Sequence, residues 1–109
     1  MPANIPRQYV LVRTDLPVTT QVVQVAHACV TAGHCFALPE YHHLVLLAVR
    51  DEWALRQAAE MLEADAGIRH TLFHEPDGDT GFTSLCTEPV SGQACRFFRR
   101  FTLWQPPTA

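Results

Sequence analysis

The stretch HLVLLAVRDEWALRQAAEMLEADAG, residues 43–67, predicts a strand followed directly by a helix. Residues 43–49 form a nearly continuous apolar run, which is typical of a strand that is covered on both faces. Asp51 is a favourable helix N-cap, and apolar residues then recur every three or four positions as far as Ala66. Gly67 suits the position just after a helix, because glycine readily adopts the left-handed conformation found there.

The rest of the chain continues this alternation of strand and helix. An apolar run at 8–13 predicts a first strand. The helix that follows is expected to be capped by the hydroxyl of Thr19 or Thr20 and to run to about Cys35. We expect two further strands, at 68–74 and 82–87, on either side of a turn at 75–81. A last helix is expected at 90–100.

This order of elements indicates the fold class. A helix between two successive strands favours parallel pairing, whereas the short turn at 75–81 makes the last two strands antiparallel. We therefore expect an α/β fold, with residues 1–109 forming a single three-layer α/β/α domain. Its core would be a small mixed four-stranded sheet with helices on both faces, and its tail, about 105–109, should be disordered.

The basic residues are unusual in kind, because all eight are arginines and the chain has no lysine. This excludes Schiff-base chemistry and a phosphate-binding P-loop lysine. The net charge of −3 gives no overall signature of nucleic-acid binding. One basic cluster, Arg96, Arg99 and Arg100 among phenylalanines, is either the solvated face of a C-terminal helix or a phosphate-contacting patch.

The four cysteines show no CxxC spacing, which is typical of free thiols in a reducing compartment such as the cytoplasm. No stretch reaches the roughly 18 apolar residues of a membrane span, and the N-terminal residues lack the pattern of a signal peptide. His70 and His74 lie on an expected strand, where side chains four residues apart are roughly 13 Å apart and cannot share one ion. We therefore expect no metal, no cofactor and no membrane partner.

Polar residues gather where ligands usually bind in open α/β sheets, beyond the carboxyl ends of the strands. Arg13 and Asp15 follow the first strand, and the acidic loop 75–80 follows the third. The first helix carries one polar stripe, which consists of Thr20, Gln24, His27 and Thr31. If the strands are parallel, the stripe and the loop share one rim and form a site; otherwise they are a solvated helix face and a solvated turn.

Several segments together resemble the type II peptidyl-tRNA hydrolase family, the archaeal and eukaryotic type. The segment Tyr9 to Leu16 is similar to the family's strand ending in R-x-D-L, and Gln24 to Ala28 is similar to its Q-x-x-H-A helix. Thr83 to Pro89 looks like its last inner strand. The chain is closer still to the divergent branch called peptidyl-tRNA hydrolase domain-containing proteins, through Leu72 to Pro76 and Phe98 to Leu103.

The resemblance implies a small mixed sheet between helices and hydrolysis of the ester that joins a peptide or aminoacyl group to tRNA. The family's apparatus is a lysine at the start of the first helix, an aspartate after the third strand and a threonine in the next loop. Here the lysine position falls on Thr20, and an acid of the loop with Thr80 would take the other two roles. The implied catalytic residues are His27, Glu75, Asp77 and Thr80, and the implied substrate-binding residues are Arg13, Asp15, Thr20 and Gln24.

The missing lysine leaves three hypotheses. The first is a tRNA-directed ester hydrolase of reduced rate, because loss of a cationic group at such a site typically costs about two to three orders of magnitude. The second is a non-catalytic protein on the same fold that binds a small molecule or an RNA end. The third is an interaction module or homodimer, whose partner surface would be the aromatic C-terminal segment, Phe97 to Trp104.

Overall fold

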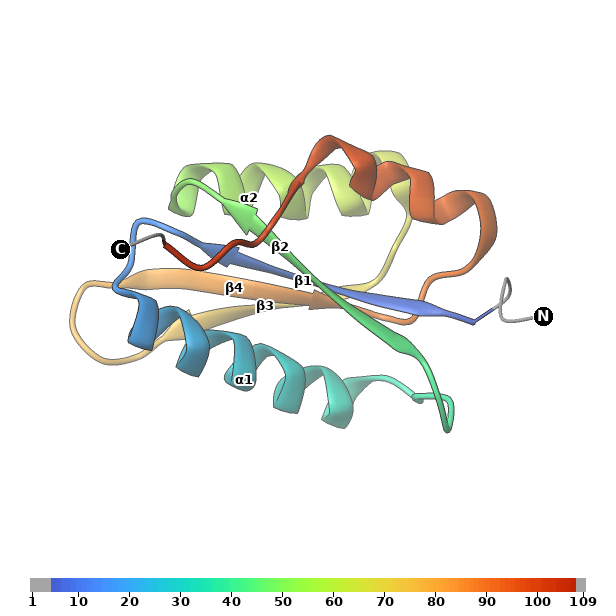
Figure 1. Cartoon of the computed structure of the whole chain (residues 1–109), viewed down its shortest axis with the longest axis horizontal. Helices are drawn as coiled ribbons and strands as arrows, with labels where there is room; N and C mark the ends of the chain where they lie inside the picture. Colours follow the sequence, from blue (N-terminus) through green and yellow to red (C-terminus); the bar gives the residue numbers. More distant parts are fainter. Residues whose placement is uncertain (1–4, 108–109) are drawn as a thin grey trace.

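The computed structural model describes residues 5–107 and shows an α/β fold (Figure 1). Its strands are β1 (Arg7–Arg13), β2 (His43–Val49), β3 (His70–Glu75), β4 (Gly81–Thr87) and β5 (Thr102–Leu103). Its helical segments are α1 (Val18–Cys35), α2 (Glu52–Met61), the π-helical turn η2 (Leu62–Ala66) and the 3₁₀ helix η3 (Gly92–Arg100). The alternation of strand and helix predicted from the sequence is therefore confirmed.

The sheet has five strands in the order β3-β4-β1-β2-β5, not the four that the sequence predicted. The additional strand, β5, spans two residues and pairs antiparallel with the second half of β2. A strand of two residues is too short to show an alternating pattern of apolar residues, which explains why the sequence did not predict β5. The prediction that β1 and β2 pair in parallel is confirmed, as is the antiparallel pair β3 and β4.

Although α2 connects β2 to β3, these two strands are not neighbours in the sheet. Instead β4 lies between β3 and β1 and runs antiparallel to both. As a consequence β1, β2 and β3 all point the same way, and their carboxyl ends lie at one edge of the sheet. The sequence predicted that the polar stripe and the acidic loop share one rim if these strands are parallel, and this condition is met.

Alternate residues of β1 enter two separate clusters of buried side chains. Tyr9 and Leu11 pack against Leu55 and other residues of α2, and this cluster also includes Phe98 of η3. Val10 packs with Ala28 and with other residues of α1. In Figure 1 α1 accordingly lies on one side of the sheet, and α2 and η3 lie on the other.

The two long helices begin in different ways. Asp51 caps α2 as predicted, since its carboxylate accepts a hydrogen bond from the backbone N–H of Ala54 at 2.8 Å. The prediction that Thr19 or Thr20 caps α1 is wrong, because the residue that precedes this helix is Pro17, at φ −55°. Both threonines lie inside the first turn, where proline has already set the direction of the chain.

Two expectations at the surface of the sheet are only partly met. The first half of β2 is not covered on both faces, and Leu44 is 57% exposed. The last helix begins at Gly92 rather than at residue 90, and it has 3₁₀ geometry.

Residues 105–107 of the expected disordered tail form no regular secondary structure, and 108–109 lie outside the described residues. Within residues 5–107, no helix is both long and apolar enough to cross a membrane.

Candidate functional site

The candidate site is a rim at the carboxyl ends of β1 and β3, next to the first turns of α1. Gln24 of α1 faces the sheet here and is only 3% exposed. Its side-chain amide nitrogen donates to the carboxylate of Glu75, the last residue of β3, at 2.6 Å. The structure therefore brings together two segments, the polar stripe and the acidic loop, that the sequence predicted to meet.

The orientation of the Gln24 amide is set by β4. The hydroxyl of Thr83 donates to the Gln24 side-chain oxygen at 2.6 Å, which leaves the amide nitrogen to face Glu75. The hydroxyl of Ser84 donates to the Gln24 backbone carbonyl at 2.9 Å. Both hydroxyl-bearing residues are fully buried, so the sheet carries a polar anchor for the helix in an otherwise apolar interface.

The Glu75 carboxylate is held in its ionised form. Hydrogen bonds from the Gln24 amide and from the backbone N–H of Asp77, at 3.2 Å, lower the pKa of this carboxyl below its ordinary value. The charges of His27 and His74 lower this pKa further, although partial burial opposes them. A carboxylate in this state accepts hydrogen bonds well, but it is a weak base at neutral pH.

His27 lies on the exposed side of α1, one turn after Gln24, and its ring stacks on Phe73 of β3. The two ring centroids are 4.7 Å apart and the planes differ by 5°. His27 is also close enough to Glu75 to lower the pKa of that carboxyl. An imidazole and a carboxylate thus share one surface, which is an arrangement suited to acid–base chemistry or to hydrogen-bonded recognition.

Arg13, at the end of β1, ties the 75–81 turn to the rest of the rim. Two of its nitrogens bind the carboxylate oxygens of Asp15, each at 2.9 Å. A third nitrogen donates to the backbone carbonyls of Thr80 and Phe82, at 2.6 and 3.0 Å. These contacts lower the pKa of Asp15 and commit most of the guanidinium donors to the protein itself.

The other predicted site residues occupy the periphery of this arrangement. Thr20 lies one turn before Gln24 on α1 and is half-buried. Asp77 is exposed and contributes its backbone N–H, rather than its carboxylate, to the Glu75 contact. The Thr80 hydroxyl is within 3.5 Å of the Asp77 carbonyl, and its own carbonyl accepts from Arg13.

Three residues of the rim were not predicted from the sequence. Thr83 and Ser84 were assigned to a strand, and two adjacent hydroxyl residues inside an apolar strand are the signal that pointed to a buried polar contact. Glu52 directly follows the predicted cap residue Asp51 and is the first residue of α2. In the structure its carboxylate also accepts the backbone N–H of Phe82 at 2.8 Å, which adds a further acid to the rim near Arg13.

A scan against protein-family models gives no match to the chain, and a search of curated proteins gives no match either. Across residues 5–107, no group of three or more His, Cys, Asp or Glu side chains is arranged to hold a metal ion. The rim itself carries carboxylates, an imidazole, hydroxyls and an amide group.

Proposed function

We propose that this protein hydrolyses the ester between a peptide or aminoacyl group and tRNA, at the rim formed by Gln24, His27 and Glu75. The observation that carries the proposal is the 2.6 Å contact between the Gln24 amide and the Glu75 carboxylate, with His27 beside it. These groups come from the two segments whose sequences resemble the type II peptidyl-tRNA hydrolases. The four cysteines are free thiols, which supports a reducing compartment such as the cytoplasm.

In the proposed reaction, Glu75 holds a water molecule and accepts its proton while the water oxygen attacks the ester carbonyl carbon. The bond between that carbon and the ribose oxygen then breaks, and the proton held by Glu75 passes through the His27 imidazole to the ribose oxygen, which restores both side chains. The products are a free acyl carboxylate and tRNA with its terminal hydroxyl restored. Gln24 keeps the carboxylate in place, and the hydroxyls of Thr20 and Thr80 are the donors for the developing oxyanion.

Two features make this reaction slow. The lowered pKa of Glu75 makes it a weak base, and the Thr20 hydroxyl cannot replace the positive charge of the lysine found in the resembling family. Since most Arg13 donors are bound within the protein, this guanidinium does not supply the missing charge. We therefore expect a rate about two to three orders of magnitude below that of an enzyme with a cation at this place.

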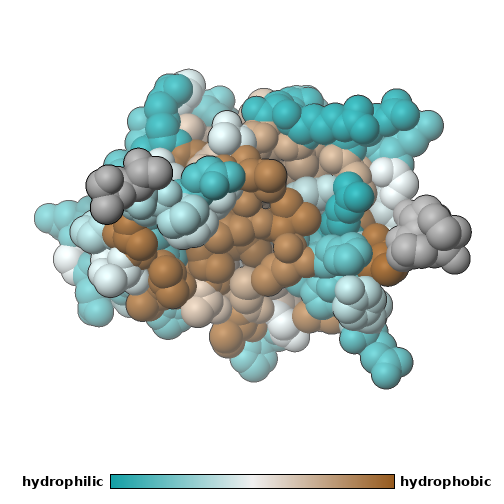
Figure 2. Space-filling model, in the orientation of Figure 1, coloured by the Kyte–Doolittle hydropathy of each residue, from teal (hydrophilic) through white to brown (hydrophobic). Residues whose placement is uncertain are grey.

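The second candidate is a non-catalytic interaction module that forms a homodimer, and the open edge of the sheet favours it. The first half of β2 has no neighbour beyond it in the described sheet, and Leu44 and Leu103 are each 57% exposed. Figure 2 shows an apolar area over the middle of the face on which β2 lies. An unpaired apolar edge is a common site of strand pairing between chains.

The experiment is a hydrolysis assay on an N-blocked aminoacyl-tRNA with the purified protein. We expect turnover above buffer that falls at least about tenfold in Glu75→Gln and in His27→Asn. The matched controls are Glu60→Gln, an exposed acid on α2, and His34→Asn, an exposed histidine in the last turn of α1. Equal rates in all variants, or no turnover from the folded protein, would reject the hydrolase.

The same preparations test the second candidate. A homodimer through the β2 edge predicts twice the chain mass by light scattering, and conversion to monomer in Leu44→Glu. A monomeric wild-type protein at high concentration would reject this candidate. The two candidates are separable, because Leu44 lies far along β2 from the carboxyl ends that form the rim.

A further inference from the structure

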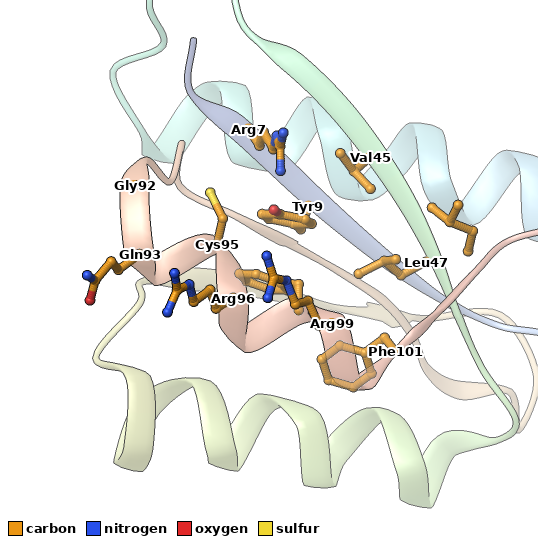
Figure 3. Close-up of a pocket in the computed structure, with 12 residues that line it drawn as sticks. Arg7, Tyr9, Val45, Leu47, Gly92, Gln93, Cys95, Arg96, Arg99 and Phe101 are labelled. Atoms are coloured by element: carbon orange, nitrogen blue, oxygen red, sulfur yellow. The ribbon is translucent and has the colours of Figure 1, made fainter. Parts of the chain in front are cut away.

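Apart from the rim, a hollow lies on the opposite side of the sheet from α1, between η3 and the strands β1, β2 and β5 (Figure 3). Its volume is about 520 Å³. Pockets that hold small ligands usually measure roughly 300–1,000 Å³, so the hollow has the size of a ligand site. None of the residues placed at the rim lines it.

Three arginines surround this hollow and no acidic residue lines it. Arg7 comes from β1, whereas Arg96 and Arg99 come from η3, so the three arginines line the hollow from two sides (Figure 3). In residues 5–107 the ion pairs are those of Arg13, Arg50 and Arg69, and the three pocket arginines belong to none of them. A chain with a net charge of −3 thus concentrates three uncompensated positive charges in one pocket.

Aromatic and aliphatic side chains form the floor of the pocket. The rings of Tyr9 and Phe98 stack at a centroid distance of 3.7 Å and are 4% and 3% exposed. Leu47 of β2 is also buried, and Phe101 continues the same wall. Aromatic and aliphatic walls of this kind bind an apolar body, while the arginines at the mouth bind a charged head.

We propose that this pocket binds a small organic anion, in which a phosphate, sulfonate or carboxylate head is attached to a single aromatic or branched apolar body. The head takes up the forked donors of Arg96 and Arg99, which match the oxygens of such groups, and Arg7 adds charge from the facing strand. The body packs on Val45, Phe101 and Leu103, which line the pocket with partly or largely exposed side chains above the buried Tyr9–Phe98 stack. This site is independent of the rim and of the hydrolysis proposed there.

The proposal assigns a role to the basic cluster whose function the sequence left open. The sequence grouped Arg96 and Arg99 with Arg100, but the fold separates them. The Arg100 guanidinium lies 4.0 Å from the centre of the Phe97 ring and donates to the Phe97 carbonyl, and it does not line the pocket. Arg7, which is 89 positions before Arg96 in the chain, takes its place.

The test is calorimetric titration of the protein with 1-naphthyl phosphate. Its two fragments, 1-naphthol and inorganic phosphate, are titrated separately, and 1-naphthoic acid tests whether a carboxylate head is accepted. We expect saturable one-site binding of naphthyl phosphate, at least about tenfold tighter than that of either fragment, because head and body are both bound. Binding of naphthol as tight as that of naphthyl phosphate would overturn the proposal, since the arginines would then contribute nothing.

The variant Arg96→Gln/Arg99→Gln removes two charges from the pocket and should weaken naphthyl phosphate binding at least about tenfold. The control Arg50→Gln/Arg56→Gln removes the same charge from exposed positions outside the pocket and should change the affinity less than about twofold. All four arginines are exposed, so circular dichroism and thermal midpoints should show folded proteins. Equal weakening in both double variants would overturn the proposal, because it would show a general effect of net charge.

Discussion

Gln24 and Glu75 are 51 positions apart in the chain, and their side chains meet at 2.6 Å. The contact joins the first helix to the last residue of β3, and through Thr83 it reaches the middle of the sheet. A nearly buried glutamine on a helix whose other buried residues are Gln21, Ala28 and Ala32 is thus explained by its partners. Because of this contact, a substitution of Gln24 or of Glu75 also alters the rim.

The first prediction concerns the coupling between Gln24 and Thr83. Gln24→Leu leaves the buried Thr83 hydroxyl without its acceptor, and we expect the free energy of unfolding to fall by about 1–3 kcal/mol. Thr83→Val should cost a similar amount alone, but little in the Gln24→Leu background, since the contact is already lost. Urea unfolding of the two single variants and the double variant measures the coupling energy. Additive losses would show that the two side chains do not interact.

The second prediction concerns the pH dependence of stability. The pKa of Glu75 is lowered in the folded protein by the Gln24 amide and the Asp77 N–H, so the contribution of this carboxylate to stability is present above its ordinary pKa of 4.5. It is lost as the pH falls through the lowered value. The difference in stability between the wild type and Glu75→Gln should therefore shrink on acidification from pH 7.

Urea unfolding of both proteins at a series of pH values from 7 to about 3 checks this prediction. Asp15, whose pKa is lowered by Arg13, contributes a slope of the same sign to both proteins and cancels in the difference. A difference that is constant over the whole series would contradict the role given to the Glu75 carboxylate.

The third prediction concerns Cys29 on α1. A hydrogen bond with the buried Cys86 thiol lowers the pKa of Cys29 to about 7, although burial opposes this shift. Burial and the same contact raise the pKa of Cys86. Alkylation of Cys29 by iodoacetamide should therefore rise with pH around a midpoint near 7, because the thiolate is the reacting form.

Peptide mass spectrometry after short exposures identifies which cysteine has reacted at each pH. In Cys86→Ala the neighbouring thiol is gone, so the midpoint for Cys29 should move upward, toward the roughly 8.5 of an ordinary cysteine. Cys35, which is exposed at the end of the same helix, serves as the internal reference for reagent and pH. An unchanged midpoint in Cys86→Ala would show that the neighbouring thiol does not set the pKa.

The fourth prediction compares two glycines of the rim turn that share a positive φ. Gly81 has φ 79°, and an added Cβ would collide with the carboxylate of Glu52, which holds the Phe82 N–H. Gly78 has φ 66° but open space around it. Gly81→Ala should therefore destabilise the fold by more than Gly78→Ala, which suffers only the backbone penalty of about 1–2 kcal/mol. Equal losses in thermal or urea unfolding would mean that the Glu52 contact is unimportant.

The elements that the sequence predicted correctly are those with strong local signals. The run at 43–49 became β2 with the same bounds, Asp51 capped α2, and Gly67 ended the helical segment at φ 63°. Each signal acts within a few residues: the apolar run, a carboxylate near free N–H groups, or a residue without Cβ. The cap of α1 was predicted wrongly because Pro17, and not the following threonines, sets where that helix starts.

The candidate site was predictable in part. The expectation that the polar stripe and the acidic loop meet depended on strand direction, which the alternation of strands and helices indicated. The partners of each side chain were not predictable, because they come from distant segments. Arg13 was expected to contact substrate, and its donors are instead bound to Asp15 and to the turn before β4.

The sequence by itself determined where the helical segments and the four longer strands lie, because these follow from the spacing of apolar residues and from turn residues nearby, whereas the two-residue strand β5 was not predictable from it. It also determined that no lysine is available to any site. Only the tertiary structure decided that Gln24 faces Glu75 and that Arg7 joins Arg96 and Arg99 around one pocket. The reason is physical: the order of strands in the sheet sets which distant side chains become neighbours, and that order depends on the packing of the whole chain rather than on any local pattern.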